Sequence, residues 1–195
     1  MNIGIDVDEV VCDLLSSILD SIHLKWGVKN TISTFAEYNF FSNNYTECDE
    51  TNKSIAEDII AWVNDTAYLY NAPPYYGVSE TIKKLFAFGH DVHFITARPE
   101  AALLATQKWF DTHAIPYTSL HALGHGSNKG LLGRQLGLNV YIDDHAVNIE
   151  SMLEHTKAVN FLIDRPYNKW YINSKVIRIS KLQDIFKYID KEIAA

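Results

Sequence analysis

The 195-residue sequence is poor in cysteine and in positive charge. Its two cysteines, Cys12 and Cys48, form no C-x-x-C or Cys/His metal-binding spacing, so we expect free thiols in a reducing compartment. The formal net charge is −7, whereas a protein that holds a long nucleic acid needs clustered Lys and Arg to neutralise the phosphates. The composition therefore argues against a long nucleic acid as partner, and leaves a small anion at a local basic site as an option.

Long apolar runs are also missing. No segment approaches the roughly 18 apolar residues of a membrane-spanning helix, and no basic leader precedes an apolar stretch. We therefore expect a cytoplasmic protein that does not enter a membrane. The sequence leaves open whether it forms a homodimer.

The sequence does contain alternating helix and strand patterns from Pro73 onward. We expect strands at 90–96, 115–120, 140–142, 158–163 and 175–179, and helices at 78–88, 99–113, 127–136, 145–155 and 181–193, with Ser127 as the N-cap of the third helix. This order is typical of the α/β class, here a Rossmann-like open parallel sheet with helices on both faces. We expect residues 1–13 and 73–195 to form this core domain.

The segment 14–72 has a different pattern. Helical periodicity is present at 14–26 and 55–63, a polar and aromatic stretch separates the two, and no convincing strand is found. The segment ends at Pro73 and Pro74, which favour a boundary. We expect a small helical cap subdomain, inserted after the first strand of the core.

Two carboxylates follow the first apolar strand pattern, Ile3 to Ile5. Asp6 and Asp8 are two residues apart, so in an extended chain their side chains point to the same side. Two unpaired carboxylates in a dry site would cost several kcal/mol. A bound cation would remove that cost.

More polar residues follow other predicted strands or start a predicted helix. They are Thr96, Lys129 and the pair Asp143 and Asp144. Ligands of open parallel sheets bind at the carboxyl ends of the strands, so these side chains are expected around one crevice. Several carboxylates favour a hard cation such as Mg²⁺, while a hydroxyl and an ammonium group suit a phosphate. The pattern predicts phosphoryl chemistry.

The motif D-V-D-E-V at Asp6, followed in order by Thr96, Lys129 and the pair Asp143 and Asp144, resembles the haloacid dehalogenase superfamily of phosphohydrolases. The resemblance implies that Asp6 is the nucleophile that attacks phosphorus and that Asp8 acts as general acid and base. It also implies Mg²⁺ on the Asp6 carboxylate, the Asp8 carbonyl and Asp144, with Asp143 acting through water. Thr96 and Lys129 would hold the phosphate, together with the neighbours of Thr96, Ala97 and Arg98.

A narrower resemblance comes from F-I-T-A-R-P at Phe94, L-I-D-R-P-Y-N at Leu162 and the helical insertion. Together these resemble the 5′(3′)-deoxyribonucleotidase family, in which a helical cap covers the site and aromatic side chains stack on the base of a nucleoside monophosphate. The resemblance implies a nucleotidase of nucleotide metabolism. The aromatic candidates for base contact are Phe40, Phe41, Trp62, Tyr68 and Tyr70, and Arg165 is a further candidate for anion contact.

Other interpretations remain open on the sequence alone. Trp62 lies at helical spacing from Ile59, which is also typical of core packing. The substrate could be another small phosphomonoester such as a sugar phosphate, or the phosphoryl group could pass to an acceptor other than water. A phosphorylatable signalling domain of the receiver type uses similar residues, but in a different order along the chain. His121 and His125 lack the partners of a zinc site.

Overall fold

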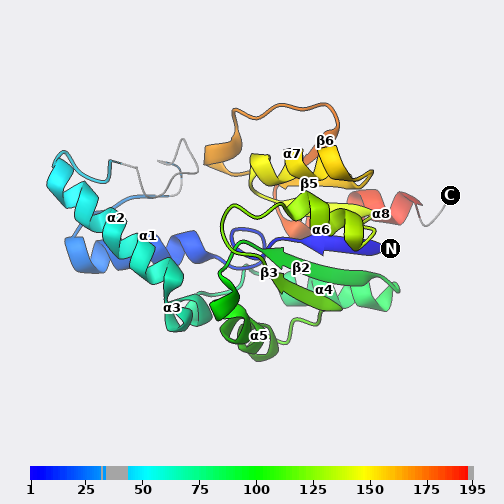
Figure 1. Ribbon diagram of the computed structural model, residues 1–195, viewed down its shortest axis with the longest axis horizontal. Coiled ribbons are helices and arrows are strands. Elements are labelled where there is room, and N and C mark those ends of the chain that lie inside the picture. Colours follow the sequence, from blue (N-terminus) through cyan, green and yellow to red (C-terminus); the bar gives the residue numbers. More distant parts are fainter. Residues whose placement is uncertain (32, 34–43, 193–195) are drawn as a thin grey trace.

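The computed structural model describes residues 1–31, 33 and 44–192, without the side chains of the last three of these (Figure 1). The strands in this part of the chain are β1 (Asn2–Ile5), β2 (Asp91–Thr96), β3 (Ser119–Ala122), β4 (Val140–Asp143), β5 (Val159–Ile163) and β6 (Val176–Ile179). They form one sheet in the order β3-β2-β1-β4-β5-β6, and every pair is parallel. The predicted α/β class with an open parallel sheet is confirmed.

The strand order places a crevice at the centre of the sheet. The chain moves outward from β1 to β3 on one side, then returns to β4 beside β1 and moves outward to β6 on the other. Connections on the two sides of this point diverge, which opens a crevice at the carboxyl ends of β1 and β4. Asp6 and the pair Asp143 and Asp144 lie at these ends.

Helices cover both faces of the sheet (Figure 1). One face packs against α4 (Val78–Ala87), α5 (Leu103–Thr112) and α8 (Phe186–Glu192), and the other against α6 (Lys129–Gln135) and α7 (Ala146–His155). In β1, Ile3 and Ile5 belong to the first core, while Gly4 faces the second. A Cβ atom on Gly4 would lie 2.5 Å from a methyl carbon of Leu138, so the close packing on that side requires glycine.

Some element boundaries differ from the sequence predictions. The third strand begins at Ser119 and not at residue 115, because the Ile115 N–H still closes the end of α5 on the Phe110 carbonyl at 2.9 Å. Asn128, and not Ser127, caps α6, since its Oδ1 accepts from the Leu131 N–H at 3.0 Å. The closing helix starts as a 3₁₀ turn, Leu182–Ile185, before α8.

Three helices lie between Asp13 and Pro73 in the described part of the chain, namely α1 (Leu14–Trp26), α2 (Asp49–Asn64) and α3 (Thr66–Asn71). They lie beyond the carboxyl ends of the strands, at the left of Figure 1. The two ends of this segment are hydrogen-bonded to each other: the Asp13 N–H donates to the Pro73 carbonyl at 2.8 Å, and the Tyr75 N–H to the Val11 carbonyl at 2.9 Å. The placement suits a cap over the crevice. No helix in the described part of the chain is long and apolar enough to cross a membrane.

Candidate active site

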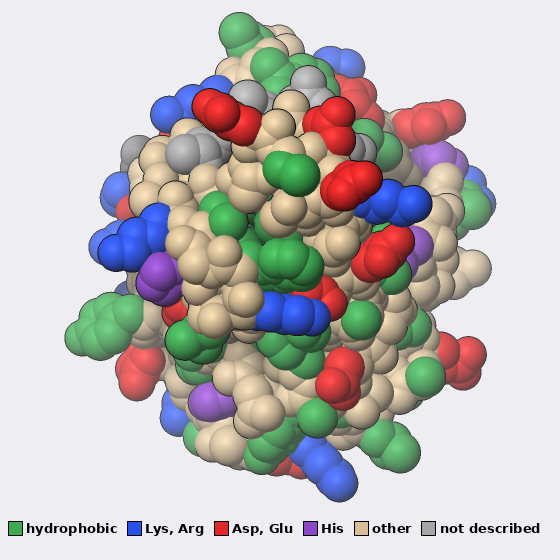
Figure 2. Space-filling view, turned by 90° about the vertical axis from the view of Figure 1, so that its left-hand side faces the viewer, with side chains coloured by type: hydrophobic (Ala, Val, Ile, Leu, Met, Phe, Trp, Pro, Cys, Tyr) green, Lys and Arg blue, Asp and Glu red, His purple; other side chains and the backbone are tan. Residues whose placement is uncertain are grey.

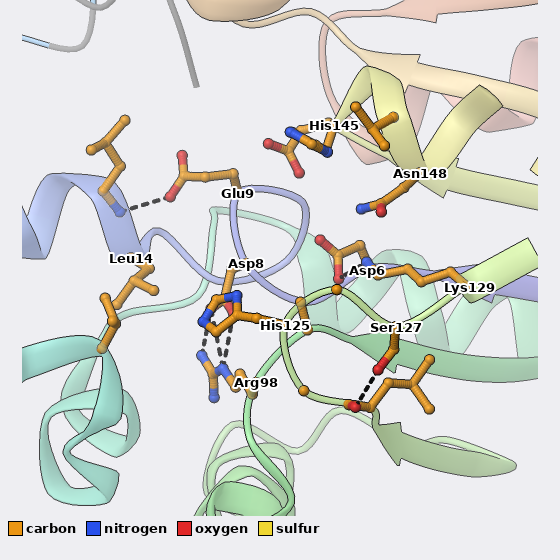
Figure 3. A pocket seen from close by; sticks show the side chains of 18 of the residues that line it. Asp6, Asp8, Glu9, Leu14, Arg98, His125, Ser127, Lys129, His145 and Asn148 are labelled. Carbon is orange, nitrogen blue, oxygen red and sulfur yellow. Dashed lines mark hydrogen bonds and ion pairs between the residues drawn. The ribbon is translucent and has the colours of Figure 1, made fainter. Parts of the chain in front are cut away.

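A cavity of about 940 Å³ lies between the sheet and the helical segment. Its floor carries the charged side chains of Asp6, Asp8 and Lys129 (Figure 3). Asp144 lines the same cavity. Aliphatic side chains from α1, α2 and α3 complete the opposite wall: Leu14, Leu15, Ile18, Val63 and Leu69. Figure 2 views the molecule from this side and shows hydrophobic side chains gathered in a central hollow, with a basic and an acidic side chain at its lower edge. The cavity therefore joins an ionic floor to an apolar roof.

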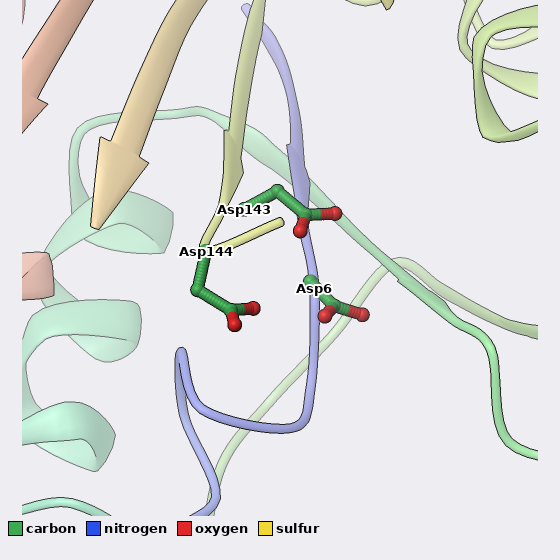
Figure 4. A group of neighbouring side chains, drawn as sticks. All are labelled: Asp6, Asp143 and Asp144. Carbon is green, nitrogen blue, oxygen red and sulfur yellow. The ribbon is translucent and has the colours of Figure 1, made fainter. Parts of the chain in front are cut away.

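Three carboxylates converge on the floor (Figure 4). Asp6 continues β1, with its N–H donating to the Ile142 carbonyl at 2.9 Å, while Asp143 ends β4 and Asp144 follows it. One oxygen of each carboxylate lies within 4.8 Å of the others, and all three side chains are buried. The structure thus brings together three of the residues that the sequence placed at one crevice.

Lys129 lies between two of these carboxylates. Its Nζ is 2.7 Å from Asp6 Oδ1 and 2.9 Å from Asp143 Oδ2. Burial alone would lower the pKa of Lys129, but the two carboxylates outweigh it and raise that pKa above its usual value. Lys129 is the first residue of α6, where the helix dipole disfavours a positive charge. The ion pairs with Asp6 and Asp143 explain why a charged lysine is stable there.

Asp143 and Asp144 differ in how far their oxygens are occupied. Asp143 accepts from the Tyr141 hydroxyl, from the His145 N–H at 2.7 Å and from Asn148 Nδ2 at 3.0 Å. Asp144 Oδ2 accepts from the Tyr167 hydroxyl at 2.5 Å, but its buried Oδ1 has no hydrogen-bond partner within the described residues. Asp144 therefore has an oxygen available to a ligand. The Asp143 carboxylate is instead held in place by its hydrogen-bond donors.

The electrostatics of the floor favour a bound cation. Burial raises the pKa of Asp6 to about 7, with repulsion from Asp143 and Asp8 in the same direction and Lys129 opposing it. Burial, then Asp143 and Asp6, raise the pKa of Asp144 well above its usual value. Lys129 brings one positive charge to three carboxylates. An all-oxygen donor set with surplus negative charge fits Mg²⁺.

Asp8 lines the cavity but its carboxylate is paired with Arg98. Arg98 Nη2 lies 2.6 Å from Asp8 Oδ1 and Nε lies 3.0 Å from Oδ2. Thr96 is fully buried and does not line the cavity; its Oγ1 accepts from the Arg98 N–H at 3.1 Å. Ala97 does line the cavity. The Arg98 side chain, predicted to contact phosphate, is thus directed at Asp8 instead.

The aromatic candidates of the helical segment lie away from the cavity where the structure describes them. Trp62 stacks on Tyr68 with ring centroids 5.6 Å apart, and the Tyr70 hydroxyl lies 2.9 Å from Thr112 Oγ1. None of these three aromatic side chains lines the cavity. The remaining two candidates, Phe40 and Phe41, lie outside the described residues.

Sequence reasoning missed Glu9, which is almost fully buried at the cavity wall. Its Oε1 accepts from the Leu15 N–H at 2.7 Å, and its Oε2 from the Tyr75 hydroxyl at 2.7 Å. Arg165 Nη2 donates to the Glu9 carbonyl at 2.5 Å, and the guanidinium lies 4.8 Å from the centre of the Tyr75 ring. Arg165 is therefore directed at the Glu9 loop. Glu9 thus connects three parts of the chain: the loop after β1, the start of α1 at Leu15, and Tyr75, which follows the helical segment.

Sequence reasoning also missed the contribution of Tyr167, Asn168 and Trp170, which follow β5. Tyr167 and Asn168 both bond to Asp144, through the Tyr167 hydroxyl and through Asn168 Nδ2, which donates to the Asp144 carbonyl at 2.8 Å. Trp170 lines the cavity and is 66% exposed, with its ring held by a 2.9 Å bond from Nε1 to the Tyr167 carbonyl. The R-P-Y-N run was the available signal, but Asp144, which Tyr167 and Asn168 both contact, lies 23 and 24 residues away in sequence.

Comparison with solved structures defines the class of this fold. A predicted phosphatase from Clostridium acetobutylicum aligns with a TM-score of 0.61 at 13% identity, over 99% of this chain and 97% of that one. L-2-haloacid dehalogenase from Xanthobacter autotrophicus aligns with a TM-score of 0.61 at 8% identity, over 97% and 98% of the two chains. The fold, with its acidic floor at the carboxyl ends of β1 and β4, is that of the haloacid dehalogenase superfamily of hydrolases.

The family model for the 5′ nucleotidase, deoxy (pyrimidine), cytosolic type C proteins matches residues 1–194, and the chain belongs to this family. A nucleotidase of Clostridium acetobutylicum is 31% identical over 116 residues, which is 58% of this chain and 58% of its own. A candidate nucleotidase of Oceanobacillus iheyensis is 24% identical over 177 residues, 87% of this chain and 89% of its own. The chain is a hydrolase of phosphate monoesters, as predicted.

Proposed function

We propose that this hydrolase uses Mg²⁺ and a phosphorylated Asp6 to remove phosphate from deoxyribonucleoside monophosphates. The observation that carries this proposal is the convergence of Asp6, Asp143 and Asp144 within 4.8 Å, with Lys129 Nζ 2.7 Å from Asp6. Asp6, Asp144 and the backbone carbonyl of Asp8 would hold the metal. Mg²⁺ held there would supply positive charge, which would lower the cost of bringing an anionic phosphate to an anionic nucleophile.

The first step transfers the phosphoryl group to the protein. An Asp6 carboxylate oxygen forms a bond to phosphorus as the bond from phosphorus to the ester oxygen breaks. Asp8, in its protonated form, gives a proton to the departing oxygen, so that an alcohol leaves. Lys129 holds Asp6 in place and offers its ammonium group to a phosphoryl oxygen.

The second step restores the protein. The Asp8 carboxylate takes a proton from water, the water oxygen bonds to phosphorus, and the bond from phosphorus to Asp6 breaks. Inorganic phosphate leaves, and Asp8 again carries the proton that the next cycle needs. One residue thus serves as acid in one step and as base in the other.

The cavity supports a nucleoside monophosphate as substrate. Its volume of about 940 Å³ lies within the range of small-ligand sites. The roof is built of Leu14, Leu15, Ile18, Val63 and Leu69, and such a surface offers little to the hydroxyl groups of a sugar phosphate. The indole of Trp170 at the cavity wall provides a face on which a base can stack.

The test is release of phosphate by the purified protein with Mg²⁺, across a panel of deoxyribonucleoside, ribonucleoside and sugar monophosphates. We expect the deoxyribonucleotides to react fastest, and Asp6→Asn to lower the rate by orders of magnitude. Asp20→Asn, on the exposed side of α1, is the matched control and should retain full activity. Full activity of Asp6→Asn would refute the nucleophile, whereas equal rates across the panel would refute the nucleotide preference. The cytoplasmic location stays a prediction, and homodimer formation stays open.

A further inference from the structure

Arg98 is one of the residues that line the cavity, but its side chain is almost fully buried against Asp8. It follows β2, and only 2% of it is exposed, whereas 21% of the Asp8 side chain is exposed and lines the cavity. Three contacts join the two groups: Arg98 Nε lies 3.0 and 3.2 Å from the two Asp8 oxygens, and Nη2 lies 2.6 Å from Oδ1. Arg98 is therefore bound to the Asp8 carboxylate. Figure 3 shows this pair to one side of Asp6 and Lys129.

Further contacts fix the guanidinium. Its Nη1 donates to Thr106 Oγ1 on α5 at 3.2 Å, and that hydroxyl donates to the Ala102 carbonyl at 2.9 Å. Its Nη2 also lies 3.4 Å from Cys12 Sγ. A planar guanidinium held at both ends presents donors in one fixed plane, so the carboxylate that it binds has one preferred rotamer.

We propose that Arg98 is a positioning residue of the reaction, which fixes the rotamer of Asp8 and does not bind the phosphate. This inference rests on the proposed role of Asp8 as proton carrier. A proton can be passed only when donor and acceptor lie within hydrogen-bond distance, so a carboxyl that rotates freely spends less time in the productive place. Thr106 has the same role at one remove, because it anchors Arg98.

Leaving groups of different basicity separate this role from a purely structural one. The departing oxygen of a nucleotide is strongly basic and needs a proton, whereas p-nitrophenolate leaves with little help. Misplacing Asp8 should therefore slow the first step for a deoxynucleoside monophosphate much more than for p-nitrophenyl phosphate. Loss of a phosphate ligand would instead raise KM for both esters, and general loosening of the fold would slow both alike.

The experiment compares wild type with Arg98→Lys, which keeps the charge but loses the planar fork, and with Thr106→Val, which removes the anchor but keeps the shape. Arg134→Lys, on the exposed side of α6, controls for the exchange itself. We expect Arg98→Lys to lower kcat/KM, which reports the first step and not the second step common to both esters, by about 10- to 100-fold more for the nucleotide than for the aryl ester, since proton transfer contributes about 10²- to 10⁴-fold. Thr106→Val should show the same selectivity at smaller size, with both KM values unchanged.

An equal loss of kcat/KM on both esters, a rise of KM on both, or unchanged kinetics would overturn the inference. If Arg98→Lys does not fold, Thr106→Val alone decides. Wild type that releases phosphate from neither ester would refute the proposed function instead, and this arm is scored first. A crystal structure of Arg98→Lys adds a readout independent of turnover: we expect the Asp8 carboxylate in a different or mixed rotamer, and an unchanged single rotamer would contradict the positioning role.

Discussion

Lys129 Nζ lies 2.7 Å from Asp6 Oδ1, and both side chains are buried beneath the cavity. The same ammonium group lies 2.9 Å from Asp143. Removing one partner of a buried ion pair leaves an uncompensated charge, which costs far more than the pair itself gains. Lys129 is thus needed both by the charge distribution of the fold and by the proposed reaction.

Lys129→Met should lower phosphate release by about 100-fold or more, because it removes a charge that stabilises the phosphoryl oxygens. Without divalent metal it should also lower the free energy of unfolding by about 3 to 5 kcal/mol, since Asp6 and Asp143 lose their counter-ion. Phosphate assays and urea unfolding measure the two effects. Lys108→Met, an exposed exchange on α5, is the control, and equal behaviour of the two variants would refute the prediction.

Addition of Mg²⁺ should raise the melting temperature, because the carboxylates of the proposed metal site come together only in the folded chain. At a concentration 100 times its Kd, the gain is about 2.7 kcal/mol. Asp144→Asn should abolish most of this shift, since the buried Oδ1 of Asp144 has no hydrogen-bond partner among the described residues. Thermal scans with EDTA and with increasing Mg²⁺ test this, and a wild type indifferent to the metal would count against the site.

Glu9 should make stability depend on pH. Burial raises its pKa from 4.5 to about 7, although the Leu15 N–H and the Tyr75 hydroxyl oppose this change. The folded state therefore binds this proton more tightly than the unfolded state does. The stability that this supplies is complete below pH 4.5 and is lost as the pH rises to 7, at about 1.4 kcal/mol for each pH unit between the two values.

Glu9→Gln removes that titration. Relative to wild type, the variant should gain about 2 to 3 kcal/mol of unfolding free energy between pH 5 and pH 8 in metal-free buffer. Urea unfolding at both pH values gives the difference. Asp20→Asn, exposed on α1, should run parallel to wild type, and a Glu9→Gln curve that also ran parallel would show that Glu9 is not the titrating group.

Trp170→Ala should weaken nucleotide binding. Stacking of a base on an aromatic ring contributes about 1 to 3 kcal/mol, so KM for a deoxynucleoside monophosphate should rise by about 5- to 150-fold. KM for glycerol phosphate, which has no base, should not change. Trp62→Phe is the matched control because Trp62 stacks on Tyr68 and does not line the cavity. A larger effect at Trp62 than at Trp170 would refute this assignment.

Much of the fold could be predicted because it follows from local patterns. Apolar strands that end in Asp6 and Asp143, separated by amphipathic helices, are sufficient to indicate a parallel sheet with ligands at its carboxyl edge. The N-cap of α6 did not follow from the local pattern: the predicted Ser127 and its neighbour Asn128 are both residue types that suit an N-cap, and only the folded backbone shows that Asn128 accepts from the Leu131 N–H.

The parts of the site that escaped prediction depend on contacts between distant residues. Arg98 lies two residues after Thr96, and its position alone favoured a phosphate ligand; its partner Asp8 is 90 residues away. Glu9 and Tyr75 are 66 residues apart in the chain and meet only because the helical segment returns to its starting point. Spacing along one sequence does not show which of several nearby acids a buried arginine or tyrosine will face.

Two backbone hydrogen bonds join the ends of the helical segment: the Asp13 N–H donates to the Pro73 carbonyl, and the Tyr75 N–H donates to the Val11 carbonyl. The chain therefore leaves the core before residue 14 and re-enters it after residue 72 at nearly the same point. Because its two ends lie side by side, such a segment can be lengthened, shortened or exchanged without moving a strand. Under the proposed function, exchange of this segment would change the substrate preference, while Asp6, Asp143 and Lys129 would keep their places in the core.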